Sequence, residues 1–197
     1  MEKIFLESII KQFEYYKLLG DKTFEQLKDE DLCRKFNTET NSIVTIIKHL
    51  SGNMLSRWTD FLNTDGEKKW RNRDDEFAEN IFTKNEFLNI WQTGWDCLFK
   101  TLQNLKFDDL HKIIFIRNQG HTVVEAINRQ LAHYSYHVGQ IVFIGKMIQN
   151  ENWKCLSIPK GNSEQYNKEK FAVPQHTAHF TDEVLNQKKP LNKETYA

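Results

Sequence analysis

Hydrophobic residues recur at intervals of three and four along four long segments of this chain, which is the spacing of amphipathic helices. The first two segments cover about residues 2–27 and 42–62. The third runs from Thr83 to about Leu105, and the fourth from about Thr122 to Gln149. An amphipathic helix needs a partner to bury its apolar stripe. We therefore predict an all-α fold whose core is a four-helix bundle.

Capping residues mark where three of these helices begin. The polar cluster at residues 38–42 supplies N-cap chemistry for the second helix. Thr83 with Glu86, and Thr122 with Glu125, have the spacing of a capping box, in which threonine and glutamate satisfy free backbone donors reciprocally. These signals place the starts of the last three helices at about residues 42, 83 and 122.

The connections between the helices differ in length and polarity. Residues 63–82 form a charged stretch that is longer than most helix connections, which predicts a crossover rather than a tight turn. Its Trp70 and basic residues either cover one end of the bundle, line the mouth of a pocket, or form an ordinary solvated loop. The β-branched run 112–116 is expected to be extended, with a turn at residues 118–120.

The composition changes after the fourth helix. Trp153, Leu156, Ile158 and Pro159 are typical of a strap that packs on the domain, and Gly161 begins a turn. From residue 174 the chain is polar and has few large apolar groups, so we expect a weakly ordered tail. We therefore expect a bundle with its strap over residues 1–173 and a tail over residues 174–197.

Charge and cysteine usage exclude several classes of function. Basic and acidic residues are equal in number, 27 each, so the chain carries no electrostatic footprint for nucleic acid or an anionic membrane. The three cysteines have no C-x-x-C spacing, which disfavours a disulfide framework or a cysteine zinc site. With no secretion signal and no long apolar run, we expect a soluble cytoplasmic protein.

Histidines provide the candidate chemistry. His133 and His137 are four residues apart within the longest predicted helix, so their side chains point the same way and can share one metal ion. With seven histidines in the chain, such a pair alone is weak support. His49 lies at the edge of the apolar stripe of the second helix, where its imidazole can face the bundle interior. Three imidazoles on one ion leave coordination positions open, as in catalytic sites.

Other metal and cofactor patterns fit the sequence poorly. No histidine has a glutamate three residues before it, so the di-iron carboxylate motif is absent. The H-E-x-x-H, G-x-S-x-G, G-x-G-x-x-G and G-x-x-x-x-G-K patterns are also absent, which removes the usual support for zincin, hydrolase-elbow and phosphate-loop chemistry. Haem held by two histidines stays conceivable but leaves the third histidine unexplained.

Taken together, these residues resemble the DinB-like superfamily of metalloenzymes. The resemblance lies in Asn41 to Ile43, in His49 with Leu50, in the run Asn53 to Leu62, and in His133 to Gln140. The stretch Asp65 to Phe77 and the strap Leu156 to Gly161 are similar to a subfamily of unknown function within it. The resemblance covers about residues 1–170.

The resemblance implies more than the spacing of the residues shows. The superfamily is an up-down-down-up four-helix bundle that is commonly a homodimer. It holds zinc, nickel or iron through three histidines, which correspond here to His49, His133 and His137. Characterised members include S-transferases that use bacillithiol or mycothiol, and a maleylpyruvate isomerase. The expected function is therefore a thiol-dependent S-transferase that activates a low-molecular-weight thiol.

A metal held by three imidazoles lowers the pKa of a bound thiol, which then attacks an electrophilic co-substrate. Asn53, Gln130 and Gln140 are candidates for contacts to the metal ligands or the substrate, and Arg57 and Arg129 for receiving a carboxylate. All five are equally compatible with ordinary polar positions at a helix edge. A metal-dependent hydrolase, and a non-catalytic dimeric metal-binding module, remain as alternatives.

Overall fold

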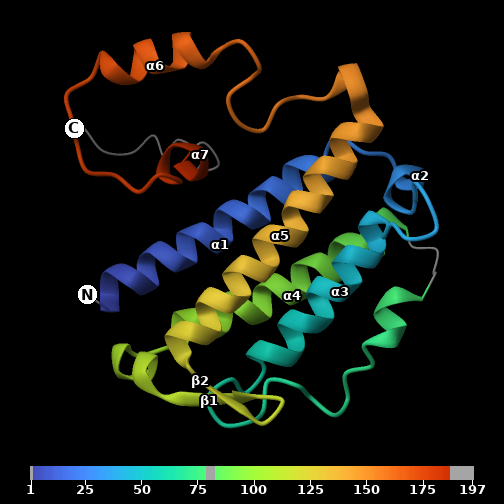
Figure 1. Ribbon diagram of the computed structural model, residues 1–197, viewed down its shortest axis with the longest axis vertical. Coiled ribbons are helices and arrows are strands. Elements are labelled where there is room, and N and C mark those ends of the chain that lie inside the picture. The colour runs from blue at the N-terminus through green and yellow to red at the C-terminus, as the bar shows by residue number, and fades with distance from the viewer. Residues whose placement is uncertain (1, 79–82, 187–197) are drawn as a thin grey trace, which may run out of the picture.

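The computed structural model describes residues 2–78 and 83–186, and its core is a bundle of long helices (Figure 1). The bundle is built from α1 (Glu2–Phe24), α3 (Ile43–Trp58), α4 (Lys84–Asn104) and α5 (Val123–Gln149). The only sheet within the described residues is a two-stranded hairpin. The predicted all-α fold is therefore confirmed.

The order of helix directions matches the expected up-down-down-up topology. In Figure 1, α1 and α5 run in one direction, and α3 and α4 run in the other. The closest packing is between α3 and α4 and between α1 and α5, which are the two parallel pairs. Parallel neighbours require the chain to return along the bundle, and the long connection after α3 makes this crossover. It contains the short 3-10 helix η1 (Asp74–Phe77).

One aromatic residue from each long helix meets at the centre of the bundle. The ring of Phe13 on α1 lies 6.5 Å from Trp58 on α3, 6.4 Å from Trp95 on α4 and 5.9 Å from Tyr134 on α5. All four side chains are buried. Tilted and edge-on ring pairs of this kind add to the stabilisation from apolar burial. This cluster fixes α3 against α5, the two helices that carry the candidate histidines.

The first helix continues through Gly20 and ends at Phe24, so the glycine does not terminate it. A Cβ atom at position 20 would lie only 2.5 Å from Cζ2 of Trp91 on α4. The residue is therefore small because the indole of the neighbouring helix packs directly on the backbone. The role of Gly20 is close packing.

The second predicted helix is shorter than expected, because α3 ends at Trp58 and not at Leu62. Thr59 has extended backbone angles, and Asp60 follows with a positive φ of 48°, which no α-helix accommodates. Thr101 on α4 also donates its hydroxyl to the backbone oxygen of Trp58. The apolar residues after this point continue the hydrophobic stripe but lie in a turn.

Strand β1 (Ile113–Ile116) confirms the predicted extended run, and it pairs antiparallel with β2 (Gln119–Thr122). The turn lies at Arg117 and Asn118, whose φ angles are 54° and 60°. Two positive φ values are typical of the type I′ turn of a two-residue hairpin. The turn predicted at residues 118–120 was therefore misplaced, since Gln119 and Gly120 belong to β2.

Of the two predicted capping boxes, the first is complete and the second is not. Thr83 and Glu86 form the full reciprocal capping box at the start of α4. At the start of α5, Thr122 accepts from the backbone N–H of Glu125, but the Glu125 carboxylate binds His121 instead of the cap backbone. Only half of the second capping box is therefore present.

The chain after α5 passes through η3 (Asn150–Asn152) and the strap to α6 (Ser163–Phe171) and α7 (Asp182–Asn186). Residues 174–186 of the expected tail are described, and in this stretch Lys11 of α1 donates to Asp182 at 2.6 Å. The rest of the tail lies outside the described residues, and the division of the chain at residue 173 stays a prediction. The shorter elements α2 (Asp29–Leu32) and η2 (Phe107–His111) cap the bundle ends. None of the described helices has the length and apolarity needed to cross a membrane.

Candidate metal centre

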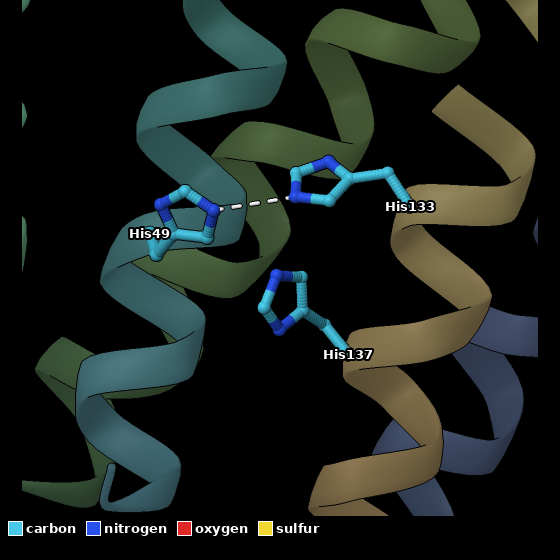
Figure 2. Close-up of side chains that lie close together, drawn as sticks. All are labelled: His49, His133 and His137. Carbon is cyan, nitrogen blue, oxygen red and sulfur yellow. Dashed lines mark hydrogen bonds between the residues drawn. The ribbon is translucent and has the colours of Figure 1, made fainter. Parts of the chain in front are cut away.

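Three histidines from two helices meet inside the bundle, as Figure 2 shows. His49 comes from α3, and His133 and His137 come from successive turns of α5. One ring nitrogen from each lies within 4.8 Å of the corresponding nitrogens of the other two. The structure thus brings together the three residues that the sequence singled out as metal ligands.

A buried carboxylate orients the imidazole of His49. Its Nδ1 lies 2.9 Å from Oε2 of Glu76 in η1. An ionised carboxylate only accepts hydrogen bonds, so Nδ1 is the donor and the lone pair of neutral His49 is on Nε2, which faces His133. Arg71 holds the same carboxylate in place through Nε and Nη2 at 2.7 and 3.0 Å. Partners of this kind are typical of metal-ligating histidines.

A similar arrangement orients His137 on α5. Its Nδ1 lies 2.8 Å from the amide oxygen of Gln140, one turn further along the same helix. Because that oxygen accepts and does not donate, the Nε2 of neutral His137 carries the lone pair. Nε2 of His133 lies 3.3 Å from Nε2 of His49. Two nitrogens on one tetrahedral zinc, each bonded at about 2.0–2.1 Å, are separated by about the same distance.

Burial and mutual repulsion keep the imidazoles of His133 and His137 neutral. Burial lowers the pKa of His133 to about 3, with further lowering by the positive forms of His137 and His49 and by Arg57 and Arg71. Burial also lowers the pKa of His137, against a smaller opposing effect of its hydrogen bond to Gln140. Neutral imidazoles are the metal-binding form, so these two histidines are ready to bind a cation at neutral pH.

The carboxyl group of Glu76 responds to two opposing effects. Burial raises its pKa, but hydrogen bonds from His49 and Arg71 and the positive charge of Arg71 lower it more. The net result is a pKa below the ordinary value for glutamic acid. Glu76 is therefore ionised at neutral pH. Its negative charge lies next to Nδ1 of His49, on the opposite side of the ring from the nitrogen that would bind a metal.

The residues present fit a divalent metal. The donor set is three nitrogens, two with their tautomer fixed by an acceptor on Nδ1, and Zn²⁺, Ni²⁺ and Fe²⁺ all accept imidazole ligands. Three protein ligands leave coordination positions for water or a substrate, whereas a structural zinc site usually has four protein ligands. The site is therefore a candidate catalytic metal centre that zinc, nickel or iron would suit.

A cavity of about 270 Å³ opens beside two of the histidines. Its lining is polar and rich in arginine. The residues that line it are His49, Asn53, Arg57, Arg71, Arg73, Arg117, Arg129, Gln130 and His133. Four of the five additional residues proposed from the sequence thus surround this cavity, and the fifth, Gln140, contacts His137 instead.

Asn53 and Gln130 are both buried beside the histidines. Oδ1 of Asn53 accepts from the hydroxyl of Tyr134 at 3.0 Å, and the same hydroxyl accepts from Nε1 of Trp58. Asn53 is therefore tied to the aromatic centre of the bundle. Oε1 of Gln130 is buried and has no hydrogen-bond partner among the described residues.

Arg57 and Arg129 line the cavity from two different helices. Arg57 is buried on α3 and donates to the backbone oxygen of Gly66 and to the carboxylate of Glu67 in the crossover. Arg129 is exposed on α5 and lies 3.3 Å from Nε2 of His121. Burial is the largest influence on Arg57 and lowers its pKa from a very high ordinary value. Both side chains carry positive charge at the cavity wall.

Several residues of the site were not proposed from the sequence. They are Glu76 of the crossover, Arg117 at the hairpin turn, and His121 on β2. Arg71 and Arg73 belong to the basic residues of 63–82, for which lining the mouth of a pocket is one of the predicted alternatives. The sequence leaves three roles open for Trp70 and the basic residues of this stretch: covering one end of the bundle, lining the mouth of a pocket, or forming a solvated loop. The structure shows that Arg71 and Arg73 line the cavity, whereas Trp70 is exposed and lies outside its lining. The sequence signal for these crossover residues is the high charge of residues 67–76, but charge alone does not show which residues pair.

A larger cavity of about 750 Å³ lies between α1 and the C-terminal segment. Its described lining contains no histidine, and it is separate from the three-histidine cluster. The presence of His49 and His133 therefore favours the smaller cavity as the functional site, although the larger cavity has more space.

The chain matches the model of a family described as "Protein of unknown function (DUF1572)" over residues 1–162. The matched range contains all three histidines and every arginine of the smaller cavity. The histidine cluster is consistent with a DinB-like metal site. Comparison with curated proteins and with solved structures gave no match.

Proposed function

The chain belongs to the DUF1572 family of proteins of unknown function, and we propose that it is a divalent-metal-dependent enzyme. The observation that carries the proposal is the convergence of His49, His133 and His137 within 4.8 Å, next to an open polar cavity. A metal held only for stability would need no cavity beside it. The combination of a three-ligand site and a substrate-sized space favours catalysis.

The reaction we propose is transfer of a low-molecular-weight thiol to an electrophilic co-substrate. A divalent ion in this site would supply Lewis acidity, which lowers the pKa of a thiol and favours its thiolate. The sulfur forms a bond to the electrophilic carbon, the leaving group departs with its bonding electron pair, and the thiol proton goes to solvent. The arginines of the cavity favour the same thiolate, since nearby positive charge stabilises an anion.

The protein groups around the site have separate roles in this proposal. Glu76 and Gln140 hold the ring orientation of His49 and His137 through their Nδ1 atoms. Gln130, which is buried, forms part of the cavity wall. Arg57 and Arg129 orient the co-substrate through its negative charge. Asn53, which is already held by Tyr134, shapes the cavity wall.

Hydrolysis with the same three ligands is the second candidate. The described lining of the cavity has no carboxylate, and both oxygens of Glu76 are engaged by His49 and Arg71. No side-chain carboxylate is therefore placed to take a proton from water. A thiol is already more acidic than water, with a pKa near 8.5 for a free cysteine, so it depends less on such a base. This favours thiol transfer over hydrolysis.

Elemental analysis of untagged protein tests the metal proposal. The parent is incubated with zinc, nickel or iron(II), desalted, and compared with the His133→Ala variant. We expect near-stoichiometric metal in the parent and a large loss in the variant. His111→Ala serves as the matched control, because His111 is exposed and contacts only Glu2 in the described part of the chain.

The loaded protein is then assayed with a small thiol, such as cysteine, and a chromogenic alkylating agent. Thiol-dependent turnover that disappears in His133→Ala supports the transferase, whereas turnover without added thiol supports the hydrolase. A parent that takes up none of the three metals contradicts the enzyme proposal. A parent that binds metal but gains only thermal stability supports a non-catalytic binding module. The homodimer expected from the resemblance stays a prediction.

A further inference from the structure

The cavity beside the histidines concentrates positive charge from separate parts of the chain. Its described lining contains five arginines and no aspartate or glutamate. Arg57 comes from α3, Arg71 and Arg73 from the crossover, Arg117 from the hairpin turn, and Arg129 from α5. Since the chain as a whole has no net charge, this local excess is a property of the fold and not of the composition.

Nearby carboxylates neutralise only part of this charge. Glu67 pairs with Arg57, Arg71 and Arg117 at 3.1, 3.6 and 3.1 Å. Among the arginines of the cavity, Glu76 pairs with Arg71 alone. Even with Asp65, which accepts from the backbone N–H of Arg117, three carboxylates face five guanidinium groups. The excess of two positive charges matches a ligand that carries two negative charges.

Two of the arginines have no carboxylate within ion-pairing distance in the described part of the chain. The guanidinium of Arg73 lies over the ring of Phe77, 5.0 Å from its centroid. Arg129 lies 3.3 Å from Nε2 of His121, whose Nδ1 is 3.0 Å from Glu125. This histidine accepts from Arg129 without cancelling its charge. Both arginines are therefore positioned but not neutralised.

We propose that the cavity binds a compact dianionic group, a phosphate or a dicarboxylate, with Arg73 and Arg129 as its principal donors. Guanidinium groups recognise such groups through paired N–H donors. The cavity volume of about 270 Å³ is the space of a small molecule and excludes a polymer. His49 and His133 line the same cavity, so the opposite end of the ligand faces the metal ligands.

The assignment of this dianion to the co-substrate rests on the proposed function, whereas binding of the dianion does not require a metal. The anionic group would act as a handle that holds the molecule, while the reacting atoms lie toward the histidines. Binding energy from such a remote group is what positions a substrate for reaction. A monoanion would satisfy only half of the excess charge and should bind more weakly.

Isothermal titration of the chelated protein tests the proposal without any contribution from a metal. The probes are inorganic phosphate, malonate and acetate at constant ionic strength. We expect saturable binding of phosphate or malonate with one site per chain, and acetate at least about tenfold weaker. Arg73→Gln and Arg129→Gln should each weaken dianion binding by about tenfold, because each removes a charge-assisted hydrogen bond.

Arg34→Gln is the matched control, since Arg34 is exposed and lies over Phe36 much as Arg73 lies over Phe77. It should bind the dianion as the parent does. Thermal unfolding of each variant verifies folding, and Arg129→Lys, which keeps the charge but loses the paired donors, should give intermediate affinity. A preference for phosphate identifies a phosphoester ligand, and a preference for malonate identifies a dicarboxylate.

Failure of both dianions to bind, or an equal loss in Arg34→Gln, would overturn the proposal. Elemental analysis of the same preparations separates this result from the metal proposal. A protein that binds stoichiometric metal but no dianion leaves the metalloenzyme proposal standing and removes this one. A protein that binds the dianion but takes up no metal supports dianion binding and removes the metalloenzyme proposal.

Discussion

The carboxylate of Glu76 occupies the space beside Gly52 that a side chain at position 52 would fill. A Cβ atom at Gly52 would lie 2.2 Å from Oε1 of Glu76 and 2.8 Å from its carboxyl carbon. Gly52 is three residues after His49 on α3, so it lies on the same face of the helix. The missing side chain is therefore what lets the crossover bring a carboxylate to Nδ1 of His49.

Gly52→Ala should weaken metal binding by about tenfold or more, because the added methyl displaces Glu76 from His49. The effect should appear although alanine favours a helix over glycine by up to about 1 kcal/mol. Competition with a chromophoric chelator measures the metal affinity of parent and variant.

Gly139→Ala is the control for this substitution. It adds the same methyl group to α5, two residues from His137, where nothing lies within 4 Å of the new Cβ. Its metal affinity should equal that of the parent. Equal metal affinities in the parent and both variants would show that the contact of Glu76 with His49 does not contribute to metal binding.

Tyr134→Phe should destabilise the fold without removing the metal site. The hydroxyl accepts from Nε1 of Trp58 and donates to Oδ1 of Asn53, and all three side chains are buried. Loss of the hydroxyl leaves two buried polar groups without partners, which costs about 1–3 kcal/mol for each unsatisfied group. Urea unfolding measures this loss. Tyr136→Phe, an exposed position on the same helix, should change stability by less than about 0.5 kcal/mol.

The four long helices were predictable because their apolar spacing and caps agree, as in the capping box of Thr83 and Glu86. The errors fell at chain reversals. The apolar residues through Leu62 continued the helical pattern, and only the positive φ of Asp60 shows why α3 stops at Trp58. Backbone angles of non-glycine residues in turns depend on tertiary contacts, which periodicity does not report.

The three histidines were predictable because an i, i+4 pair and one inward histidine on another helix are visible in the sequence. Their partners were not equally visible. Gln140 follows His137 at helical spacing, but Glu76 is 27 residues from His49 in a connection without periodicity. The charge excess of the cavity also depends on which arginines pair with Glu67, and that is decided only by the folded crossover.

The metal-free protein should become less stable as the pH is lowered, because of His133. Its pKa is lowered to about 3 in the folded chain from an ordinary value of 6.5, so below pH 6.5 the unfolded chain binds more protons. The stability from this group is complete above pH 6.5 and is lost as the pH falls toward 3. Urea unfolding of chelated protein at pH 7.5 and 5.0 should show a larger loss in the parent than in His133→Gln, and equal losses would contradict this account.

Gln140 offers a substitution that should strengthen the metal site instead of weakening it. Gln140→Glu places a carboxylate where the amide oxygen now accepts from Nδ1 of His137, which raises the basicity of Nε2. Metal affinity should rise by a few-fold, whereas Gln140→Leu should lower it by about tenfold, since the ring loses its partner. Chelator competition measures both. Gln92→Leu on the exposed face of α4 is the control and should match the parent. If the glutamate and leucine variants bind metal equally well, the hydrogen bond to Gln140 does not tune His137.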